Sequence, residues 1–506
     1  DKIARFQKLD DEFQKLTIDY IVATLSSGIP QKETTGLSED WKLIQREIQK
    51  QRRHKAVRQL ICEASGAVKK LAPCMMMSPL SVAQYLPVSK EAFDVVIFDE
   101  ASQITTWDAI GALSRGRQII VAGDPKQMPP SNFFGRSVES NEEELDFDDD
   151  LESILDDLIG SGVATLRLNW HYRSRCESLI AFSNDRYYDG TLVTFPSSST
   201  CQKSVSFRYI ADACYKRRAG INEKEAKALV KECVSRLMHK DPAIRNKSIG
   251  IVTFNSHQQK LIEDLLDAER SKHPELEPAF SSDNPDAVFV KNLETVQGDE
   301  RDVILFSVTF GPDESGKVLM NFGPLNRSGG ERRLNVAFTR AKYEMVIFSS
   351  LQPEQIDLNR TNAQGVADLK HFLQYAKQGK SALGSFVTGS LGGYESPFEQ
   401  EVANALRQKG WTVHTQIGCS SYRIDLAVVH PDKPGAYLAG IECDGYTYHS
   451  SATARDRDKL RQAVLESLGW NIIRVWSTDW WTNKKGSIEE LHSALTALYE
   501  PLKQPT

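Results

Sequence analysis

Two adjacent carboxylates, Asp99 and Glu100, have the residue types and the setting that phosphate chemistry requires. They come directly after Phe93–Phe98 (FDVVIF), a short apolar run typical of a buried parallel strand. Phosphoryl transfer needs one carboxylate to hold Mg²⁺ and a second group to orient or deprotonate the attacking water. At the carboxyl tip of a strand, both would face the crevice where α/β sheets bind ligands. The pair alone is a weak signal, because an acidic pair after a strand is more often part of a solvated loop.

Four further motifs follow this acidic pair along the chain. They are GDPKQMPP (Gly123–Pro130), HYRS (His171–Ser174), VQGDERD (Val296–Asp302) and NVAFTRAK (Asn335–Lys342). Together with the acidic pair, this ordered set resembles motifs II to VI of superfamily 1 helicases, closest to the nonsense-mediated-decay type, over roughly residues 70 to 350. Five motifs in the same order and spacing are a highly specific signal.

The resemblance implies roles in ATP hydrolysis for several residues of these motifs. Asp99 would bind Mg²⁺, and Glu100 would act as the general base for water. Gln127 would sense the γ-phosphate of ATP. Arg173 and Arg340 would act as arginine fingers, since a guanidinium stays charged and binds phosphate oxygens in pairs.

The same resemblance assigns Gln297, Gly298 and Glu300 to the link between the nucleotide and the nucleic-acid track. One element of the pattern is missing, because no GxxxxGK[ST] phosphate loop occurs in the sequence. In this family the loop precedes the equivalent of Pro73–Leu80. We therefore expect an upstream segment or another chain to carry the loop, and we expect these 506 residues alone to hydrolyse ATP very weakly or not at all.

A second set of acids lies near the end of the chain. Asp425 stands in YRIDLAV and Glu442 in AGIECDG, two apolar segments typical of strands, and Glu399 stands in the helical stretch FEQEV. An unpaired carboxylate on a buried strand is costly. A divalent metal between two such acids would remove that cost, and carboxylate oxygens suit Mg²⁺.

This part of the chain resembles the PD-(D/E)xK restriction-endonuclease fold, in its very-short-patch-repair-like branch, over roughly residues 394 to 481. The resemblance implies that Asp425 and Glu442 bind Mg²⁺, with Mn²⁺ also possible, and that Glu399 matches an acid of the first helix. The pattern departs at Asp444, which stands where many relatives carry Lys and could be a further ligand. The cation that stabilises the transition state is therefore open, and the candidates are His449, Arg455 and Lys459. In an alternative interpretation, Asp425 and Glu442 pair with Arg423 and Arg474 in a degenerate DNA-binding module.

Composition limits the class of protein but does not identify its binding partner. The 506 residues have a formal net charge of −6, and much of the acid is concentrated in Glu139–Asp157 (ESNEEELDFDDDLESILDD). Outside this run, which is most often a solvated loop, the chain is slightly basic. The eight Cys form no CxxC pair, so we expect reduced thiols and a cytoplasmic protein. No apolar run reaches the roughly 18 to 20 residues that cross a bilayer, so we expect no membrane partner.

The pattern of strands and helices predicts an α/β protein with two RecA-like parallel-sheet units, of which the first is incomplete. Helical periodicity over residues 1–25 and 41–70 adds an N-terminal helical arm, and a restriction-endonuclease-like α/β domain ends the chain. The expected divisions are 1–70 (helical arm or insertion), 71–137 (partial first RecA-like domain), 138–159 (acidic loop), 160–355 (second RecA-like domain), 356–393 (helix and Gly/Ser linker) and 394–506 (nuclease-like domain).

The leading hypothesis is a fragment of an ATP-dependent DNA helicase–nuclease that serves DNA repair or defence against foreign DNA. The first alternative is a translocase or remodeller whose terminal domain only binds DNA. The second is an RNA helicase, because the resemblance of the motor includes RNA enzymes. A scaffold that has lost its phosphate loop is a third, non-enzymatic alternative.

Overall fold

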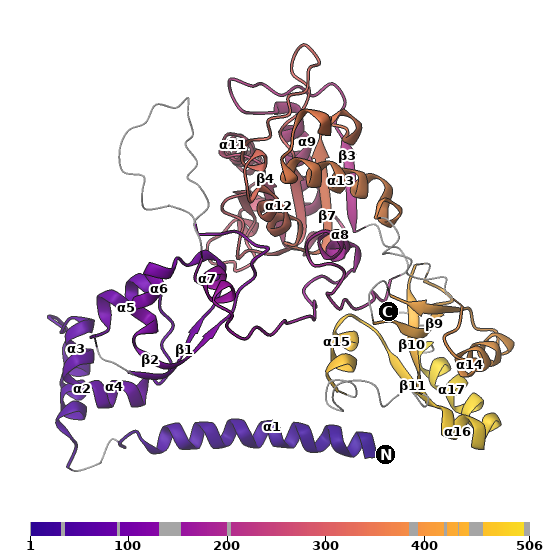
Figure 1. Cartoon of the computed structure of the whole chain (residues 1–506). Coiled ribbons are helices and arrows are strands. Elements are labelled where there is room, and N and C mark those ends of the chain that lie inside the picture. The colour runs from indigo at the N-terminus through magenta and orange to yellow at the C-terminus, as the bar shows by residue number, and fades with distance from the viewer. Residues whose placement is uncertain are drawn as a thin grey trace. The chain divides into compact units, whose positions relative to one another are not determined.

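The computed structural model of the chain describes residues 2–31, 36–88, 92–130, 153–199, 204–383, 393–418, 422–433, 435–444 and 459–499. The chain forms two compact units, one of residues 1–125 and 129–165 and the other of residues 126–128 and 166–506 (Figure 1). We call the first the N-terminal unit. Within the second, we call residues 166–383 the central domain and residues 393–499 the C-terminal domain, because each has its own sheet.

The N-terminal unit begins with helix α1 (Lys2–Ser27), which agrees with the helical periodicity predicted over residues 1–25. Its apolar stripe is exposed, with Phe13 at 68% and Tyr20 at 72% of their accessible surface. The described residues contain no helix, α1 included, with the length and apolar character needed to cross a bilayer.

The helical stretch expected over residues 41–70 is divided into three. It consists of α2 (Glu39–Gln49), α3 (Val57–Glu63) and α4 (Ser65–Leu71). The break falls on the polar run Gln51–Lys55, which offers no apolar side chain to hold a helix against a core. Next comes α5 (Pro79–Tyr85), which begins with proline in its first turn, where the missing N–H costs nothing.

The sheet of the N-terminal unit has two parallel strands, β1 (Phe93–Phe98) and β2 (Gly116–Val121). Helices α6 (Thr106–Leu113) and α7 (Ile154–Gly160) pack with Phe98 in its core. Apolar side chains on the strands remain exposed, namely Val95, Ile97, Ile119 and Ile120. This arrangement confirms the expected parallel α/β unit with an incomplete sheet.

Helix α7 lies at the end of the acidic run that we expected to be a loop. Ser153 and Asp156 form a capping box, in which the Ser153 hydroxyl accepts from the Asp156 backbone N–H and the Asp156 carboxylate accepts from Ser153. The last acids of the run therefore start a helix. Residues 131–152, which hold most of the run, lie outside the described residues.

The central domain has a five-stranded parallel sheet in the order β3-β7-β6-β4-β5. Its strands are β3 (Val205–Tyr209), β4 (Ile249–Thr253), β5 (Phe289–Asn292), β6 (Arg301–Ser307) and β7 (Ala341–Ser349). Its helices are α8 (Ser178–Tyr187), α9 (Glu223–Leu237), α10 (Pro242–Arg245), α11 (Ser256–Lys272), α12 (Gly330–Phe338) and α13 (Gln364–Gln378). The predicted second parallel-sheet unit is confirmed.

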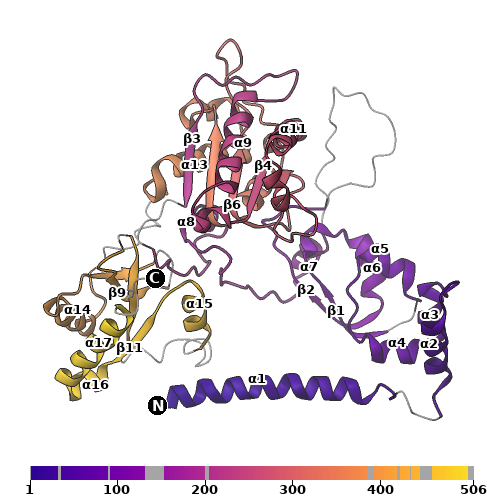
Figure 2. The same ribbon diagram turned by 180° about the vertical axis from the view of Figure 1, so that it is seen from behind.

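Both faces of this sheet are covered at its three central strands, β4, β6 and β7, which explains why these strands are largely apolar runs. Along β6, Ile304 and Phe306 pack on the side of α8, α12 and α13, whereas Val303 and Leu305 pack on the side of α9 and α11. Figure 2 shows the sheet from behind, with α9 and α11 in front of it. Helix α13 packs into the first of these cores, so the compact domain continues beyond residue 355.

The C-terminal domain has a mixed four-stranded sheet in the order β11-β10-β9-β8. Its elements are α14 (Pro397–Gln408), β8 (Val413–Ile417), β9 (Ile424–Val429), β10 (Tyr437–Asp444), α15 (Arg461–Ser467), β11 (Ile472–Trp476), α16 (Ser477–Thr482) and α17 (Lys484–Tyr499). Helices α14 and α17 cover one face together (Figure 1). The helix and the strands around the acids agree with the sequence pattern, whereas β8 was not expected, because its pattern VHTQI is only weakly apolar.

Candidate functional site

Asp99 and Glu100 lie where the chain leaves β1, at the carboxyl end of the N-terminal sheet. Two backbone hydrogen bonds join the strand ends there, from Ala122 N to Phe98 O at 2.8 Å and from Ala101 N to Ala122 O at 2.9 Å. Glu100 has a φ of 51°, in the left-handed region that a residue with a Cβ rarely adopts. The turn exposes both carboxylates, and Asp99 Oδ1 accepts from the Glu100 backbone N–H at 3.0 Å. Both carboxylates therefore lie exposed where the strand ends.

Gly123, the first residue of GDPKQMPP, approaches this turn closely. A Cβ at Gly123 would lie 3.1 Å from the backbone nitrogens of Ala101 and Ser102 and 3.0 Å from a methyl group of Leu155. Only glycine permits this approach without displacing backbone. The end of β2 is thereby held beside the acidic turn.

In the central domain, three motifs meet at Glu300. The Glu300 carboxylate pairs with Arg173 Nε at 2.7 Å and with Lys342 Nζ at 3.0 Å. Burial raises the pKa of Glu300, but the Lys342 hydrogen bond and the charges of Arg173, Lys342 and Arg340 outweigh burial and hold it below its ordinary value. The loop before α8, the start of β6 and the start of β7 supply these side chains. The structure thus brings together both predicted arginine fingers and Glu300.

His171 belongs to the same cluster, although the sequence analysis gave it no role. Burial and the charges of Arg173 and Arg340 lower the pKa of His171 to about 4, so the ring is neutral at physiological pH. Its Nε2 atom lies 2.9 Å from the Ser174 hydroxyl and accepts from the Ser174 backbone N–H at 3.3 Å. This contact shapes the turn that presents Arg173.

Gln127 and Gln297 meet within the same unit, since residues 126–128 pack with the central domain. Gln297 Nε2 lies 3.5 Å from Gln127 Oε1, and Asn335 Nδ2 donates to the Lys126 carbonyl at 2.9 Å. Gly298 has a φ of 89°, so the turn after Gln297 needs glycine. Asn335 was quoted in the last motif without a role, and only the tertiary contact shows that it holds the Gln127 segment.

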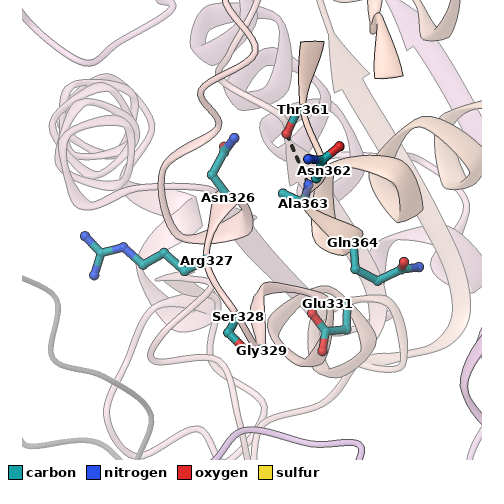
Figure 3. A pocket seen from close by; sticks show the side chains of 9 residues that line it. All are labelled: Asn326, Arg327, Ser328, Gly329, Glu331, Thr361, Asn362, Ala363 and Gln364. Atoms are coloured by element: carbon teal, nitrogen blue, oxygen red, sulfur yellow. Dashed lines mark hydrogen bonds between the residues drawn. The ribbon is translucent and has the colours of Figure 1, made fainter. Parts of the chain in front are cut away.

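Arg340 lies at the carboxyl end of α12 and is only 3% exposed. Its guanidinium donates to the Val336 carbonyl at 2.8 Å and to the Thr339 hydroxyl at 3.0 Å. A pocket of about 490 Å³ opens at the opposite, amino end of the same helix (Figure 3). Its lining is polar and comprises Asn326, Arg327, Ser328, Gly329, Glu331, Thr361, Asn362, Ala363 and Gln364. The predicted nucleotide residues lie outside this pocket.

In the C-terminal domain, the strand register places Asp425 and Glu442 side by side. Gly440 lies opposite Ala427 and Ile441 opposite Leu426 on antiparallel β10 and β9, so the next position pairs Glu442 with Asp425. Directly opposed side chains have Cβ atoms about 5 Å apart, a distance at which like charges destabilise a sheet.

Burial and nearby charges perturb both acids. Burial and the charge of Glu442 raise the pKa of Asp425, although Asp425 Oδ2 accepts from the Cys443 backbone N–H at 2.7 Å. Burial also raises the pKa of Glu442, against the lowering effect of a hydrogen bond from Tyr422. Two opposed acids with raised pKa values fit a divalent cation, because Mg²⁺ takes one or two carboxylates and completes its shell with water. Within the described ranges, no group of three or more His, Cys, Asp or Glu side chains meets the geometry of a metal site.

Glu399 lies near enough to raise the pKa of Asp425, yet its own oxygens are engaged. One oxygen accepts from the Ser396 hydroxyl at 2.8 Å, and the other accepts from the Glu395 backbone N–H and from Gln416 Nε2, both at 3.0 Å. These contacts cap α14, and they give Glu399 a structural role beside the predicted catalytic one.

Asp444 is close to Arg474, with an N–O distance of 3.9 Å, and its charge raises the pKa of both Asp425 and Glu442. Of the cations considered for the missing lysine, His449 and Arg455 lie outside the described residues. Lys459 is half-buried just before α15.

Two residues of this site escaped the sequence analysis as functional candidates. The Tyr422 hydroxyl donates to Glu442 Oε1 at 2.7 Å. Arg461, in the first turn of α15, lies 5.2 Å from the centre of the Tyr422 ring and lowers the pKa of Glu442 through its charge. Tyr422 stands three residues before Asp425 on the same segment, which is the one sequence signal that could have pointed to it.

Three family models match the chain. An AAA domain (AAA_11) matches residues 29–133, a second AAA domain (AAA_12) matches residues 151–352, and REase_MTES_1575 matches residues 398–495. The uncharacterized ATP-dependent helicase MG140 homolog of Mycoplasma pneumoniae is 31% identical over 451 residues, which are 85% of this chain and 39% of that protein. The uncharacterized ATP-dependent helicase MG140 of Mycoplasma genitalium is 30% identical over 448 residues, with the same shares.

A third relative combines two activities in its name. The DNA replication ATP-dependent helicase/nuclease DNA2 of Gallus gallus is 26% identical over 264 residues, which are 51% of this chain and 23% of that protein. The chain thus spans 39% of the length of the two Mycoplasma relatives. It belongs to the superfamily 1 helicases with AAA_11 and AAA_12 domains and carries a restriction-endonuclease-like C-terminal domain.

Proposed function

We propose that the chain is part of an ATP-dependent DNA helicase–nuclease, in which ATP hydrolysis moves DNA and the C-terminal domain cuts its phosphodiester backbone. One observation carries the nuclease half of this proposal: Asp425 and Glu442 are half-buried on neighbouring strands, one position beyond the pair Leu426 and Ile441, and both have raised pKa values. Paired carboxylates with raised pKa values are typical of metal-binding and catalytic sites. The helicase/nuclease DNA2 offers a parallel by name. A role in DNA repair or in defence against foreign DNA would suit such an enzyme.

In the nuclease site, Asp425 and Glu442 would hold a Mg²⁺ or Mn²⁺ ion between β9 and β10. The ion would lower the pKa of an attacking water and neutralise charge on the scissile phosphate. Tyr422 and the Cys443 backbone N–H would fix the carboxylate oxygens in place. Arg461 is our candidate for the cation that relatives supply as lysine, because it lies over the Tyr422 ring and its charge acts on Glu442.

In the motor, Asp99 would bind the Mg²⁺ of ATP and Glu100 would accept a proton from the attacking water. Arg173 and Arg340 would stabilise charge on the transferred phosphoryl group, which requires Arg173 to exchange Glu300 for phosphate oxygens. Gln127 and Gln297 would report the γ-phosphate to the nucleic-acid track. A phosphate loop from additional sequence completes this site in our proposal, since none occurs in the 506 residues.

Cleavage of labelled single- and double-stranded DNA in Mg²⁺ and in Mn²⁺ tests the nuclease directly. We expect cleavage by the chain and a loss of at least about 100-fold in Asp425→Ala, because one of two metal carboxylates is removed. Glu490→Gln, an exposed acid of α17, serves as the matched control and should cleave like the parent. Equal cleavage by Asp425→Ala would refute the site, and so would an absence of cleavage on every DNA tested.

A DNA-binding translocase is the second candidate, and the acid at position 444 favours it. Asp444 stands at the signature position where many relatives carry lysine, and its charge raises the pKa of Glu442. The third signature position therefore supplies a negative charge where those relatives supply a positive one. In this case the chain would bind DNA and cleave none. Competition between DNA and RNA strands of one sequence would separate both candidates from an RNA helicase.

A further inference from the structure

A segment of the central domain, Val193–Ser199, lies on the C-terminal domain and bonds to it through several backbone atoms. Trp470 Nε1 donates to the Pro196 carbonyl at 2.7 Å, and the Tyr437 backbone N–H donates to the Ser198 carbonyl at 2.9 Å. The Ser198 hydroxyl donates to the Leu468 carbonyl at 3.0 Å. We call Val193–Ser199 the docking segment.

The docking segment also supplies apolar core to the C-terminal domain. Phe195 is 3% exposed and packs in a cluster with Ile424, Ala427, Leu465 and Trp470. Helices α14 and α17 cover one face of the C-terminal sheet, and this cluster lies apart from their core. Because Phe195 is buried in this cluster, the docking segment is part of the apolar packing of the C-terminal domain.

Phe195 reaches the metal acids through one intermediate. Its ring lies 5.3 Å from the Tyr422 ring, at an interplanar angle of 50°. The Tyr422 hydroxyl in turn donates to Glu442 Oε1 at 2.7 Å. The position of the Glu442 carboxylate therefore depends on a tyrosine whose ring rests on a residue of the central domain.

We propose that the docking segment completes the nuclease site, with Phe195 holding Tyr422 and Tyr422 orienting Glu442 for the metal. Both are positioning residues, and the inference rests on the nuclease function proposed above. The C-terminal domain would then bind its metal at full strength only while docked on the central domain.

The docking segment also contacts the chain around Trp170, next to the motif HYRS of the central domain. Backbone hydrogen bonds join Val193 to the chain on both sides of Trp170, from Val193 N to Asn169 O at 2.7 Å and from His171 N to Val193 O at 2.9 Å. Trp170 also packs edge-on against Phe195, with ring centres 5.5 Å apart. The docking segment is thus hydrogen-bonded directly to the start of the motif that carries Arg173, the first predicted arginine finger.

Calorimetric titration of Mn²⁺ into the full 506-residue chain, without nucleotide or DNA, tests the proposal by a readout other than cleavage. The signal of Asp425→Ala is subtracted to isolate the nuclease site. Removing an outer partner of a metal ligand typically weakens metal affinity 10- to 100-fold. We therefore expect the Kd for Mn²⁺ to rise about 10-fold or more in Tyr422→Phe and in Phe195→Ala. Phe195→Leu, which keeps apolar bulk without the ring, should give a smaller rise and serves if Phe195→Ala does not fold.

Phe310→Ala is the matched control, because Phe310 is another buried phenylalanine of the central domain, packed among Phe254 and Phe322 away from the docking segment. It should leave the Kd unchanged. Wild-type affinity in both Phe195 variants would overturn the role of the docking segment, and an equal loss in Phe310→Ala would attribute the effect to general destabilisation and overturn it too. If the parent binds no more Mn²⁺ than Asp425→Ala does, the nuclease proposal itself fails, and this is visible before any Phe195 variant is measured.

Discussion

Replacing Asp425 by Asn should make the metal-free protein more stable while it abolishes cleavage. The two acids are directly opposed across β9 and β10, and burial together with their mutual repulsion raises the pKa of Asp425. An asparagine keeps the carbonyl oxygen that accepts from the Cys443 backbone N–H, but it carries no charge. Function and stability are therefore opposed at this position.

The size of the effect follows from the distance between the charges. Two unit charges about 5 Å apart at an effective dielectric constant of about 20 repel by roughly 3 kcal/mol. Arg461 and Arg474 already offset part of this at Glu442. We therefore expect Asp425→Asn to stabilise by about 1 to 3 kcal/mol, which is a rise of roughly 5 °C or more in the melting temperature of a domain of this size.

The effect must depend on pH in a definite direction. A carboxyl group whose pKa is raised by folding contributes its full stability below the pKa of the unfolded chain, near 4, and loses it as the pH rises through the folded value. The advantage of Asp425→Asn should thus be small at pH 5 and should grow toward pH 8. Scanning calorimetry of the full chain in EDTA at both pH values measures it, with Glu490→Gln as the control.

Added metal should stabilise the parent but not the Asp425→Asn variant. Saturating Mn²⁺ should stabilise the parent, by about 2.7 kcal/mol at a free concentration of 100 Kd, and should leave Asp425→Asn unchanged. A variant that melts at or below the parent in EDTA at pH 8 would refute the reasoning, because it would mean that the two acids do not strain the metal-free domain.

Three further predictions concern the motor. Gly123→Ala should destabilise the N-terminal unit by about 1 to 3 kcal/mol in thermal melts, since its Cβ would press on the backbone of the acidic turn; an unchanged melt would contradict this close approach. Glu225 is a buried acid in the first turn of α9. Burial raises the pKa of Glu225 to about 7, so its contribution to stability is full below about pH 4.5 and is lost as the pH rises toward 7. Glu225→Gln should remove this loss of up to about 3 kcal/mol in melts between pH 4.5 and 7. Burial lowers the pKa of His171 to about 4, so its contribution is present above about pH 6.5 and is lost as the pH falls toward 4. His171→Gln should remove this acid-induced loss in melts between pH 7 and 4, and an unaltered pH profile would contradict a buried neutral imidazole.

The parts of the site that could be predicted were those whose residues lie close together in the sequence. The acid pair after β1 and the acids on β9 and β10 were recognisable because apolar strand patterns and acidic residues lie next to each other in the sequence. The helical stretch over residues 41–70 and the strand β8 were less predictable, because their apolar patterns are weak and packing decides where each element begins and ends.

Sequence by itself determined the helicase family of the motor and predicted a metal-dependent chemistry for the C-terminal domain. Motif order identified the motor, and carboxylates on apolar strands indicated a metal site, because residue type and local spacing are properties of the chain. Only the tertiary structure decided which groups serve which acid. Glu300 holds Arg173 from more than a hundred positions away, Tyr422 bonds to Glu442, and Phe195 supports Tyr422 from another domain. Such contacts depend on strand register and on domain docking, which bring together residues that no local pattern connects.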